Sequence, residues 1–456
     1  MLRILKRRRF LQSLAIAAVT PSIALLARSE TSRFGPLRPD PDGLIDLPDG
    51  FSYRVVSRAG ELMNDGLRVP HAHDGMAAFA GDDGRIILVC NHELGLNEMK
   101  LGAFGTDIDS IPAFVREKIY DAGNGTSPIA GGTTTTIYNP TTGKTEHQHL
   151  SLTGTEWNCA GGPTPWGSWL TCEETFRVPG RLGEEYREKA HGYVFEVPAR
   201  ETGLVEPVPI KAMGRFEHEA AAVHAASGIV YLTEDQNSCL FYRYIPNQAG
   251  HLLAGGRLQA LAIGDGPSVR TDNWSATSKF PFDEELPVRW IDLDNVDSDK
   301  NDLRTRGAAL GATTFMRCED ICAAGDEFFF TATIGGPSLL GQVFRYSASP
   351  DEGQDAESAN PGTLTLIAES TAHSLLRGGD NITMAPFGDL IVCEDVATHC
   401  GIVGIGPDGM QYAIADNPHS DSELAGAGFS PDGQILFVNI QYPGITLAIT
   451  GPWPAA

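Results

Sequence analysis

The stretch Gly84-Arg-Ile-Ile-Leu-Val-Cys-Asn91 has a pattern that occurs six times in this chain: a turn glycine followed by a short apolar run. The other copies begin at Gly167, Gly228, Gly325, Gly388 and Gly433. Each copy is typical of a buried strand entered from a hairpin turn. Because such strands return at intervals of several tens of residues, the sequence predicts an all-β fold, a six-bladed β-propeller with loop and short helical insertions.

Composition agrees with one large domain of short strands and turns. The chain has 456 residues, of which 51 are glycine and 29 are proline, and 42% are hydrophobic. We expect a single propeller domain over residues 45–456, and residues 107–120 have the helical spacing of an insertion lying over one face. The formal net charge of −24 argues against nucleic acid or an anionic membrane as a partner, since both require positive patches. An anionic substrate would therefore need bound cations at its site.

Polar side chains recur where the repeated strands end. One set comes at the strand ends and a second set comes shortly before each hairpin. The first set is Asn91, Glu173, Glu234, Glu394 and Asn439, and the second is Asp74, Cys159, Glu219, Glu319, Asn381 and Glu423. Equivalent positions of different blades meet around one central channel, where buried carboxylates need compensation. Oxygen ligands favour calcium or another hard cation. The alternative is that these acids pair with arginines such as Arg215, Arg243, Arg317 and Arg377 or cap exposed loops.

Three stretches add detail to the predicted metal site. Cys159 precedes a Gly-Gly-Pro turn, and a thiolate among carboxylates favours a softer, more Lewis-acidic ion such as iron in a mixed site. In a regular strand Glu217 and Glu219 would share one face. Arg317 and Glu319 would also share a face, and an arginine beside metals is suited to bind a phosphate or carboxylate. A small core cysteine and local salt bridges remain open alternatives.

The N-terminus predicts export. Lys6-Arg7-Arg8-Arg9-Phe10-Leu11 matches a twin-arginine signal, and an uncharged apolar stretch follows it. That stretch is too short to span a membrane. We expect a signal peptide over residues 1–28, recognised by the twin-arginine translocase, and a periplasmic or secreted protein without a stable membrane anchor.

At this point the sequence resembles a known family, the PhoX-type alkaline phosphatases. The resemblance extends from about residue 45 to the C-terminus, and the block around Cys159 is its most specific part. It is carried by Asn91-His-Glu93, Asn158-Cys-Ala-Gly-Gly-Pro-Thr-Pro-Trp-Gly167, Thr171-Cys-Glu-Glu174, His218-Glu-Ala-Ala221, Tyr231-Leu-Thr-Glu-Asp235 and Gly379-Asp-Asn-Ile382. It implies a six-bladed propeller whose channel holds Fe³⁺ and Ca²⁺ and which hydrolyses phosphate monoesters outside the cytoplasm.

The resemblance also implies roles for individual residues. Cys159 resembles the iron-ligating cysteine of the family, and Arg317 and Glu319 resemble its substrate-contacting pair. The acidic metal ligands implied are Glu173, Glu174, Glu219, Glu234 and Asp235, with Asn91, Glu93, Asn381 and Glu394 as supports or calcium ligands.

The sequence therefore predicts a monomeric, metal-dependent phosphomonoesterase that acts on a small phosphate ester. Two other classes stay open. One is a calcium-dependent propeller lactonase, which would need neither iron nor a cysteine ligand. The other is an exported binding propeller in which calcium is structural and no turnover occurs.

Overall fold

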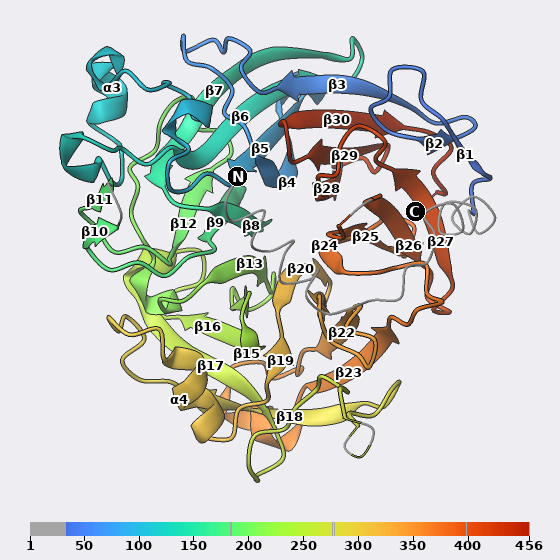
Figure 1. Cartoon of the computed structure of the whole chain (residues 1–456). Coiled ribbons are helices and arrows are strands. Elements are labelled where there is room, and N and C mark those ends of the chain that lie inside the picture. Colours follow the sequence, from blue (N-terminus) through green and yellow to red (C-terminus); the bar gives the residue numbers. More distant parts are fainter. Residues whose placement is uncertain (1–32, 183–184, 276, 278, 398, 456) are drawn as a thin grey trace.

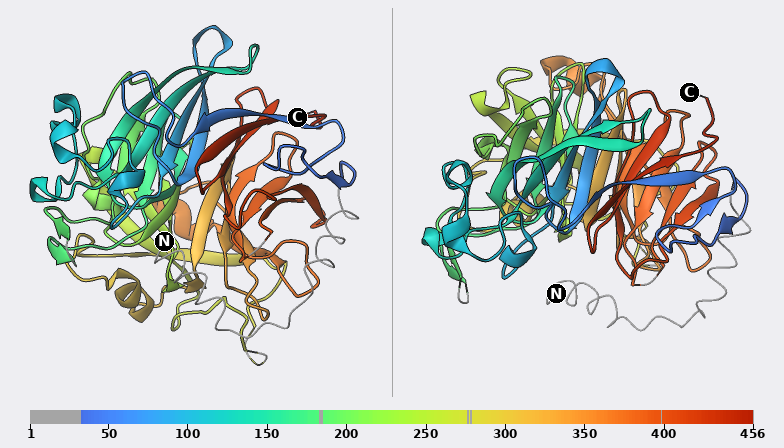
Figure 2. Two further views of the ribbon diagram at one scale, coloured as in Figure 1. Left: turned by 45° about the horizontal axis from the view of Figure 1, so that its top comes forward. Right: turned by 90° about the horizontal axis from the view of Figure 1, so that it is seen from above.

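The computed structural model describes residues 33–182, 185–275, 277, 279–397 and 399–455. The predicted signal peptide at 1–28 lies outside these residues. Strands dominate the described chain, and they are arranged around a central axis (Figures 1 and 2). Among the described residues, no helix has the length and apolar composition that crossing a membrane requires.

Six groups of antiparallel strands surround the axis. In chain order their innermost strands are β4, β8, β13, β20, β24 and β28, and each contacts the next until β28 returns to β4. The groups are β4 (His73–Ala80), β5 (Ile86–His92), β6 (Gly131–Asn139) and β7 (Lys144–Thr155); β8 (Asn158–Pro163), β9 (Ser168–Glu173) and β12 (Val194–Pro198); β13 (His218–Val223), β14 (Val230–Glu234), β16 (Tyr242–Pro246) and β17 (Gly256–Ile263); β20 (Cys318–Ala324), β21 (Glu327–Ala332), β22 (Gln342–Ser347) and β23 (Thr363–Glu369); β24 (Gly379–Met384), β25 (Leu390–Glu394), β26 (Gly401–Ile405) and β27 (Gln411–Asp416); β28 (Leu424–Phe429), β29 (Ile435–Ile440), β30 (Ile445–Thr450) and β3 (Ser52–Arg58).

Hydrogen bonding does not divide these strands into six separate sheets. Three groups are four-stranded sheets and one is a three-stranded sheet. The groups that begin with β13 and β20 merge into one sheet of nine strands, because β18 (Leu286–Asp292) pairs with both β17 and β23. The structure thus confirms an all-β, propeller-like arrangement, and the count of six independent blades is not shown by the sheets.

The remaining elements are short. Small strand pairs are formed by β1 (Leu37–Arg38) with β2 (Leu47–Pro48), β10 (Gly180–Leu182) with β11 (Glu185–Arg187), and β15 (Asn237–Cys239) with β19 (Phe315–Met316). The helices of the described residues are α3 (Ala113–Arg116), α4 (Leu303–Ala309) and the 3-10 turns η1 (Asp82–Gly84), η2 (Met99–Leu101), η3 (Ile108–Ser110), η4 (Gly123–Gly125), η5 (Lys211–Met213), η6 (Leu252–Ala254) and η7 (Asp355–Ala359). The predicted insertion near 107–120 carries η3 and α3 and lies at the rim (Figure 1).

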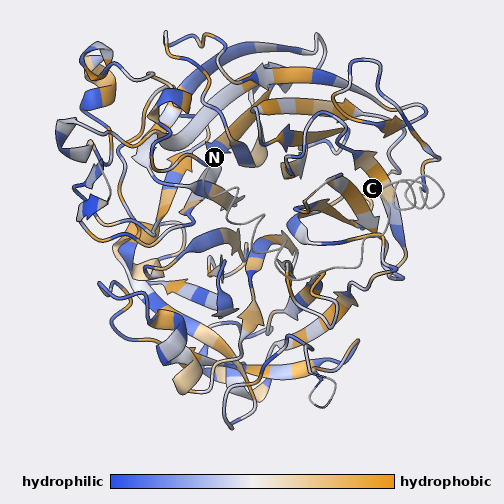
Figure 3. Cartoon of the chain, in the orientation of Figure 1, coloured by the Kyte–Doolittle hydropathy of each residue, from blue (hydrophilic) through white to orange (hydrophobic). Residues whose placement is uncertain are grey.

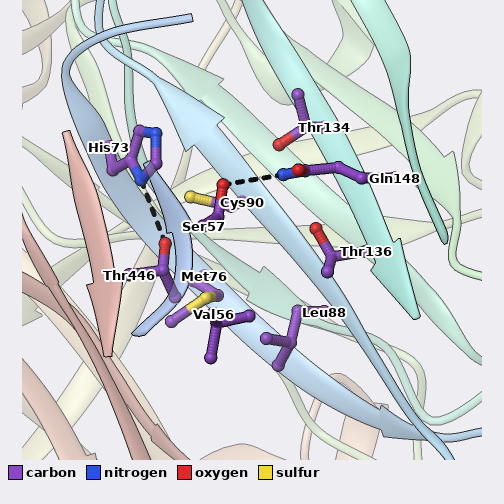
Figure 4. A pocket seen from close by; sticks show the side chains of 10 residues that line it. All are labelled: Val56, Ser57, His73, Met76, Leu88, Cys90, Thr134, Thr136, Gln148 and Thr446. Carbon is purple, nitrogen blue, oxygen red and sulfur yellow. Dashed lines mark hydrogen bonds between the residues drawn. The ribbon is translucent and has the colours of Figure 1, made fainter. Parts of the chain in front are cut away.

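Packing between neighbouring groups forms the core, and apolar residues follow the strands (Figure 3). The ring is closed by β3, which pairs with β30 from the other end of the chain. Next to this junction, side chains of β3, β30 and β4–β7 surround a void too narrow to admit a water molecule (Figure 4). A hydrogen bond between His73 and Thr446 (3.0 Å) and one donated by Gln148 to Ser57 (2.9 Å) join its walls, so the void is a packing defect rather than a ligand site.

Candidate metal centre

All six innermost strands contain the same irregularity near their first residue. In each strand, one residue near the start pairs with the neighbouring strand. The next two residues are unpaired and form a β-bulge, and pairing then resumes in a shifted register. The first bulged residue is Asp74, Cys159, Glu219, Glu319, Asp380 and Gly426 in the six strands in turn. A bulge bends the strand and re-aims its side chains. Five of these six positions carry a side chain that can bind metal.

A second ring of polar residues follows the adjacent strands. Glu93, Glu174, Asp235 and Asp395 are each the first residue after β5, β9, β14 and β25, respectively. In every case the last strand residue pairs with the residue just before the bulge. The residue after the strand is therefore carried to the level of the bulged side chain.

Residues of these two rings, together with Glu423, which directly precedes β28, form four overlapping groups that could each hold a metal ion, and we call them the ligand groups. Within each group the ligand atoms lie within 4.8 Å of one another. The groups are Glu93, Cys159 and Glu174; Asp74, Glu93 and Glu423; Asp380, Asp395 and Glu423; and Glu219, Glu319 and Asp380. Glu93, Glu423 and Asp380 each belong to two groups, so the groups are continuous. Shared carboxylates are what a centre for several metal ions requires.

The buried charge at this centre supports metal binding. Glu219 is fully buried, and neither carboxylate oxygen has a hydrogen-bond partner among the described residues. Burial, followed by the charge of Glu319, raises the pKa of Glu219 well above its usual value. Burial and then the charge of Asp74 likewise raise the pKa of the Cys159 thiol. An uncompensated buried carboxylate is costly, so these residues fit a set of bound cations.

One arginine lies at the edge of the centre. Arg317 occupies the position just before Cys318 and the bulge, and it has a left-handed backbone with φ of 55°. Its Nε and Nη2 donate to the two oxygens of Asp235 at 2.7 and 2.8 Å, and Nη2 also pairs with Glu319 at 2.8 Å. Two carboxylates from different strand groups thus fix its orientation.

The structure separates the predicted site residues into two kinds. Cys159, Glu174, Glu219, Glu93 and Glu319 belong to the ligand groups, and Asp235 pairs with Arg317. Glu319, predicted as catalytic, therefore lies among ligands. Four residues of the centre were not among the predicted ligands: Asp74, Asp380, Asp395 and Glu423. Asp74 and Glu423 stood in the ring of polar positions before the hairpins, and Asp395 follows Glu394 as Glu174 follows Glu173.

The other predicted ligands make structural hydrogen bonds. Glu234 accepts from the Tyr242 hydroxyl at 2.7 Å. Glu394 accepts from the backbone N–H of Arg377 at 2.9 Å and of Gly401 at 3.1 Å. Asn91 donates to the carbonyls of Cys159 and Ala160, both at 2.9 Å, and Asn381 accepts from Gly426 N–H. Neither Glu234 nor Glu394 belongs to the four ligand groups. Their geometry is that of supports.

Glu173 supports the centre through a fully buried network. Its oxygens accept from the backbone N–H of Glu156 (2.9 Å) and Gly192 (2.9 Å), and it pairs with His191 Nδ1 at 2.6 Å. Nε2 of His191 faces Asp121 at 3.1 Å. Both oxygens of Glu173 are therefore occupied by this network, and Glu173 belongs to none of the ligand groups, whereas the neighbouring Glu174 does.

Because of His191, we expect the stability of the protein to fall at alkaline pH. The two carboxylates, Glu173 first, outweigh burial and raise the pKa of His191 to about 9. Because this folded pKa exceeds the usual value of 6.5, the stabilisation is complete below about pH 6.5 and is lost as pH rises through about 9. The free energy of unfolding should fall by about 3 kcal/mol. We expect urea unfolding at several pH values to show this decline in wild-type protein and a flatter profile in His191→Gln; parallel profiles would contradict it.

Comparison with known proteins assigns the chain to a family. Fold and site together describe a propeller-like protein with a candidate metal centre rich in carboxylates and containing one thiol. The family profile described as alkaline phosphatase PhoX matches residues 32–444, and the chain belongs to this family, which places it among the phosphoric monoester hydrolases.

Solved structures support the fold. Pseudomonas fluorescens PhoX in complex with vanadate, a transition state analogue, superposes with a TM-score of 0.65 at 19% identity, covering 92% of this chain and 97% of that one. A gluconolactonase from Xanthomonas campestris gives a TM-score of 0.38 at 12% identity, covering 92% and 98%, which is too low to support an inference. A search of curated protein sequences gave no match.

Proposed function

We propose that this chain is an exported alkaline phosphatase that hydrolyses phosphate monoesters at its channel centre, with Fe³⁺ and Ca²⁺ as the metals and a six-bladed propeller as the scaffold. The observation that carries the proposal is the continuous run of shared carboxylates that ends at Cys159. The group of Cys159, Glu93 and Glu174 offers a sulfur and suits iron, whereas the all-carboxylate groups suit calcium.

In this proposal the bound metals and Arg317 both act on the phosphoryl group, and two carboxylates orient Arg317. When bound, the metal ions supply Lewis acidity and positive charge toward the phosphoryl oxygens. Arg317 provides a planar fork of donors suited to phosphate, and Asp235 and Glu319 hold that fork at a fixed angle. The strongly negative chain attracts an anionic ester only where cations reverse the local charge.

Metal analysis of the purified mature protein, combined with p-nitrophenyl phosphate turnover at alkaline pH, tests the proposal. We expect both iron and calcium, visible absorption from a ferric thiolate, and loss of turnover when a calcium chelator is added. Calcium alone without turnover would contradict it and favour a binding propeller. Calcium alone with hydrolysis of a lactone would favour the lactonase.

Cys159→Ser should identify the iron ligand. The substitution replaces a buried thiol by a smaller, harder oxygen, so we expect iron content, visible absorption and turnover to fall together by more than about 10-fold. Cys172→Ser is the matched control, because Cys172 is equally buried but belongs to none of the ligand groups. Full retention of iron in Cys159→Ser would show that this cysteine is structural.

Export by the twin-arginine route is part of the same proposal. It is supported by Arg7-Arg8-Arg9-Phe10-Leu11 near the N-terminus. Replacing Arg7, Arg8 and Arg9 by lysines should leave the precursor in the cytoplasm. The mass of the mature protein will show whether the signal peptide is cleaved near residue 28.

A further inference from the structure

A surface cleft lies far along the strands from the channel centre, between two neighbouring sheets. Its walls come from β5, β6, β7 and the turn at residues 81–85 on one side and from residues 199–202, which follow β12, on the other. Its volume is about 370 Å³. The sheet of β8, β9 and β12 has three strands in the described chain, whereas its neighbour has four, and the cleft lies beside β12, the outermost of the three.

Two histidines of β7 face this cleft. His147 and His149 are two residues apart on one strand, so their side chains project from the same face, and both line the cleft. Their ring centroids are 5.4 Å apart. Two imidazoles bound to one tetrahedral ion at about 2.0–2.1 Å would place their centroids about 5 Å apart. The pair already has nearly the spacing of two ligands of one metal.

The fold leaves the ring of His149 weakly satisfied. It is only 4% exposed, and among the described residues neither ring nitrogen meets full hydrogen-bond geometry, with the backbone of Glu201 as its nearby partner. Burial, with a smaller contribution from His147, lowers the pKa of His149 and outweighs the opposing effects of the Asp65 charge and of the hydrogen bond to the Glu201 backbone. The ring is therefore neutral at neutral pH and offers a nitrogen lone pair to an electrophile.

The charges around the cleft favour a cation. The two arginines are already paired, Arg85 with Glu146 at 3.0 Å and Arg200 with Asp82 at 2.8 Å. Asp83 and Glu201 line the same cleft and add further negative charge. An anion would meet this excess of carboxylates, whereas a divalent cation would be attracted by it. Imidazole nitrogen suits zinc and similar transition metals better than calcium or magnesium.

We propose that this cleft binds one divalent transition-metal ion of the zinc type through His147 and His149. The remaining ligands would be water and a carboxylate of the cleft, with Glu201 the candidate because its segment lines the cleft across from β7. That segment is held at both ends, by Arg200 on the Ala80 carbonyl (2.9 Å) and by Val205 N–H on the Ser151 carbonyl (2.9 Å). A bound ion would link the sheet of β4–β7 to the segment that follows β12, and so stabilise the contact between the two sheets.

The test measures zinc and cobalt binding to full-length mature protein whose channel metals are left in place. We expect one additional equivalent of Zn²⁺, and Co²⁺ absorption bands typical of nitrogen ligation. His147→Ala and His149→Ala should each weaken this binding by more than about 100-fold, since outer-shell partners alone contribute about 10- to 100-fold. His251→Ala, an exposed histidine elsewhere, is the control. Phosphatase turnover should not change in His147→Ala.

A second measurement, the change in Tm when Zn²⁺ is added, tests the proposal even if an alanine variant folds poorly. Excess Zn²⁺ should raise the Tm of wild-type protein, because a ligand that binds only the folded state stabilises it. His147→Gln, which retains polarity at a partly exposed position, should lose that rise. Equal zinc stoichiometry and equal Tm shifts in wild-type and both alanine variants would overturn the proposal. So would specific binding of inorganic phosphate that depends on Arg85 and excludes zinc.

Discussion

Metal-free protein carrying Glu219→Gln is expected to be more stable than metal-free wild-type protein, although the same substitution should remove phosphatase turnover. Glu219 is fully buried, and its two oxygens have no hydrogen-bond partner among the residues that the structure describes. A buried polar group without a partner costs about 1–3 kcal/mol and a charged group costs more, and a neutral amide of similar shape removes the part of the cost that comes from the charge. We expect the free energy of unfolding to rise by about 1–3 kcal/mol.

The loss of activity follows from the same position. Glu219 is the first bulged residue of β13, and its carboxylate shares a ligand group with Glu319 and Asp380. An amide binds a metal ion less strongly than a carboxylate does, so we expect metal content to fall and kcat to drop by more than about 100-fold. Urea unfolding after chelation, metal analysis and turnover of p-nitrophenyl phosphate measure the three effects.

Glu234→Gln provides the matched control. Glu234 is equally buried and lies at the end of β14, opposite the residue that precedes the same bulge. Its carboxylate is satisfied by the Tyr242 hydroxyl at 2.7 Å and by Arg304 at 3.3 Å. Substitution there should destabilise metal-free protein. If both substitutions destabilise it equally, Glu219 is an ordinary structural acid and the proposed centre loses its strongest support.

The sequence was sufficient to predict the repeating strands, but not their register. A turn glycine and an apolar run are local features, and the predicted strands at Gly84 and Gly388 appear as β5 and β25. The bulge depends on pairing with a second strand, which a single sequence does not reveal. Because of the bulge, Asp380 rather than Asn381 is equivalent to Glu219.

The paired acids show the same limit. Glu173-Glu174 and Glu394-Asp395 are alike in sequence, and only the cross-strand pairing distinguishes their members. Glu173 and Glu394, the last residues of their strands, accept hydrogen bonds from backbone N–H groups. Glu174 and Asp395, which follow them, belong to the ligand groups. The merger of two strand groups through β18 was equally hidden, because it joins segments far apart along the chain.

Arg317→Ala is expected to lower kcat/KM for phosphate monoesters by about 100- to 1,000-fold, with most of the effect in kcat. Removing a single donor that stabilises developing charge typically costs this much. The effect should lie in kcat because a fixed fork of donors matches the phosphoryl group best as charge develops on its oxygens. Arg317→Lys should recover little, since an ammonium cannot replace the two-pronged contact.

The decisive comparison is between metal content and turnover. Arg317 also neutralises Asp235 and Glu319, so a purely structural arginine would lose metal and activity in parallel when it is replaced. Replacing a substrate-binding arginine would remove turnover while iron and calcium stay at wild-type levels. Arg304→Ala is the control, because Arg304 pairs with the strand-end acid Glu234 outside the ligand groups. It should change kcat little. Wild-type turnover in Arg317→Ala would remove this residue from the mechanism and leave phosphate binding to the metal centre alone.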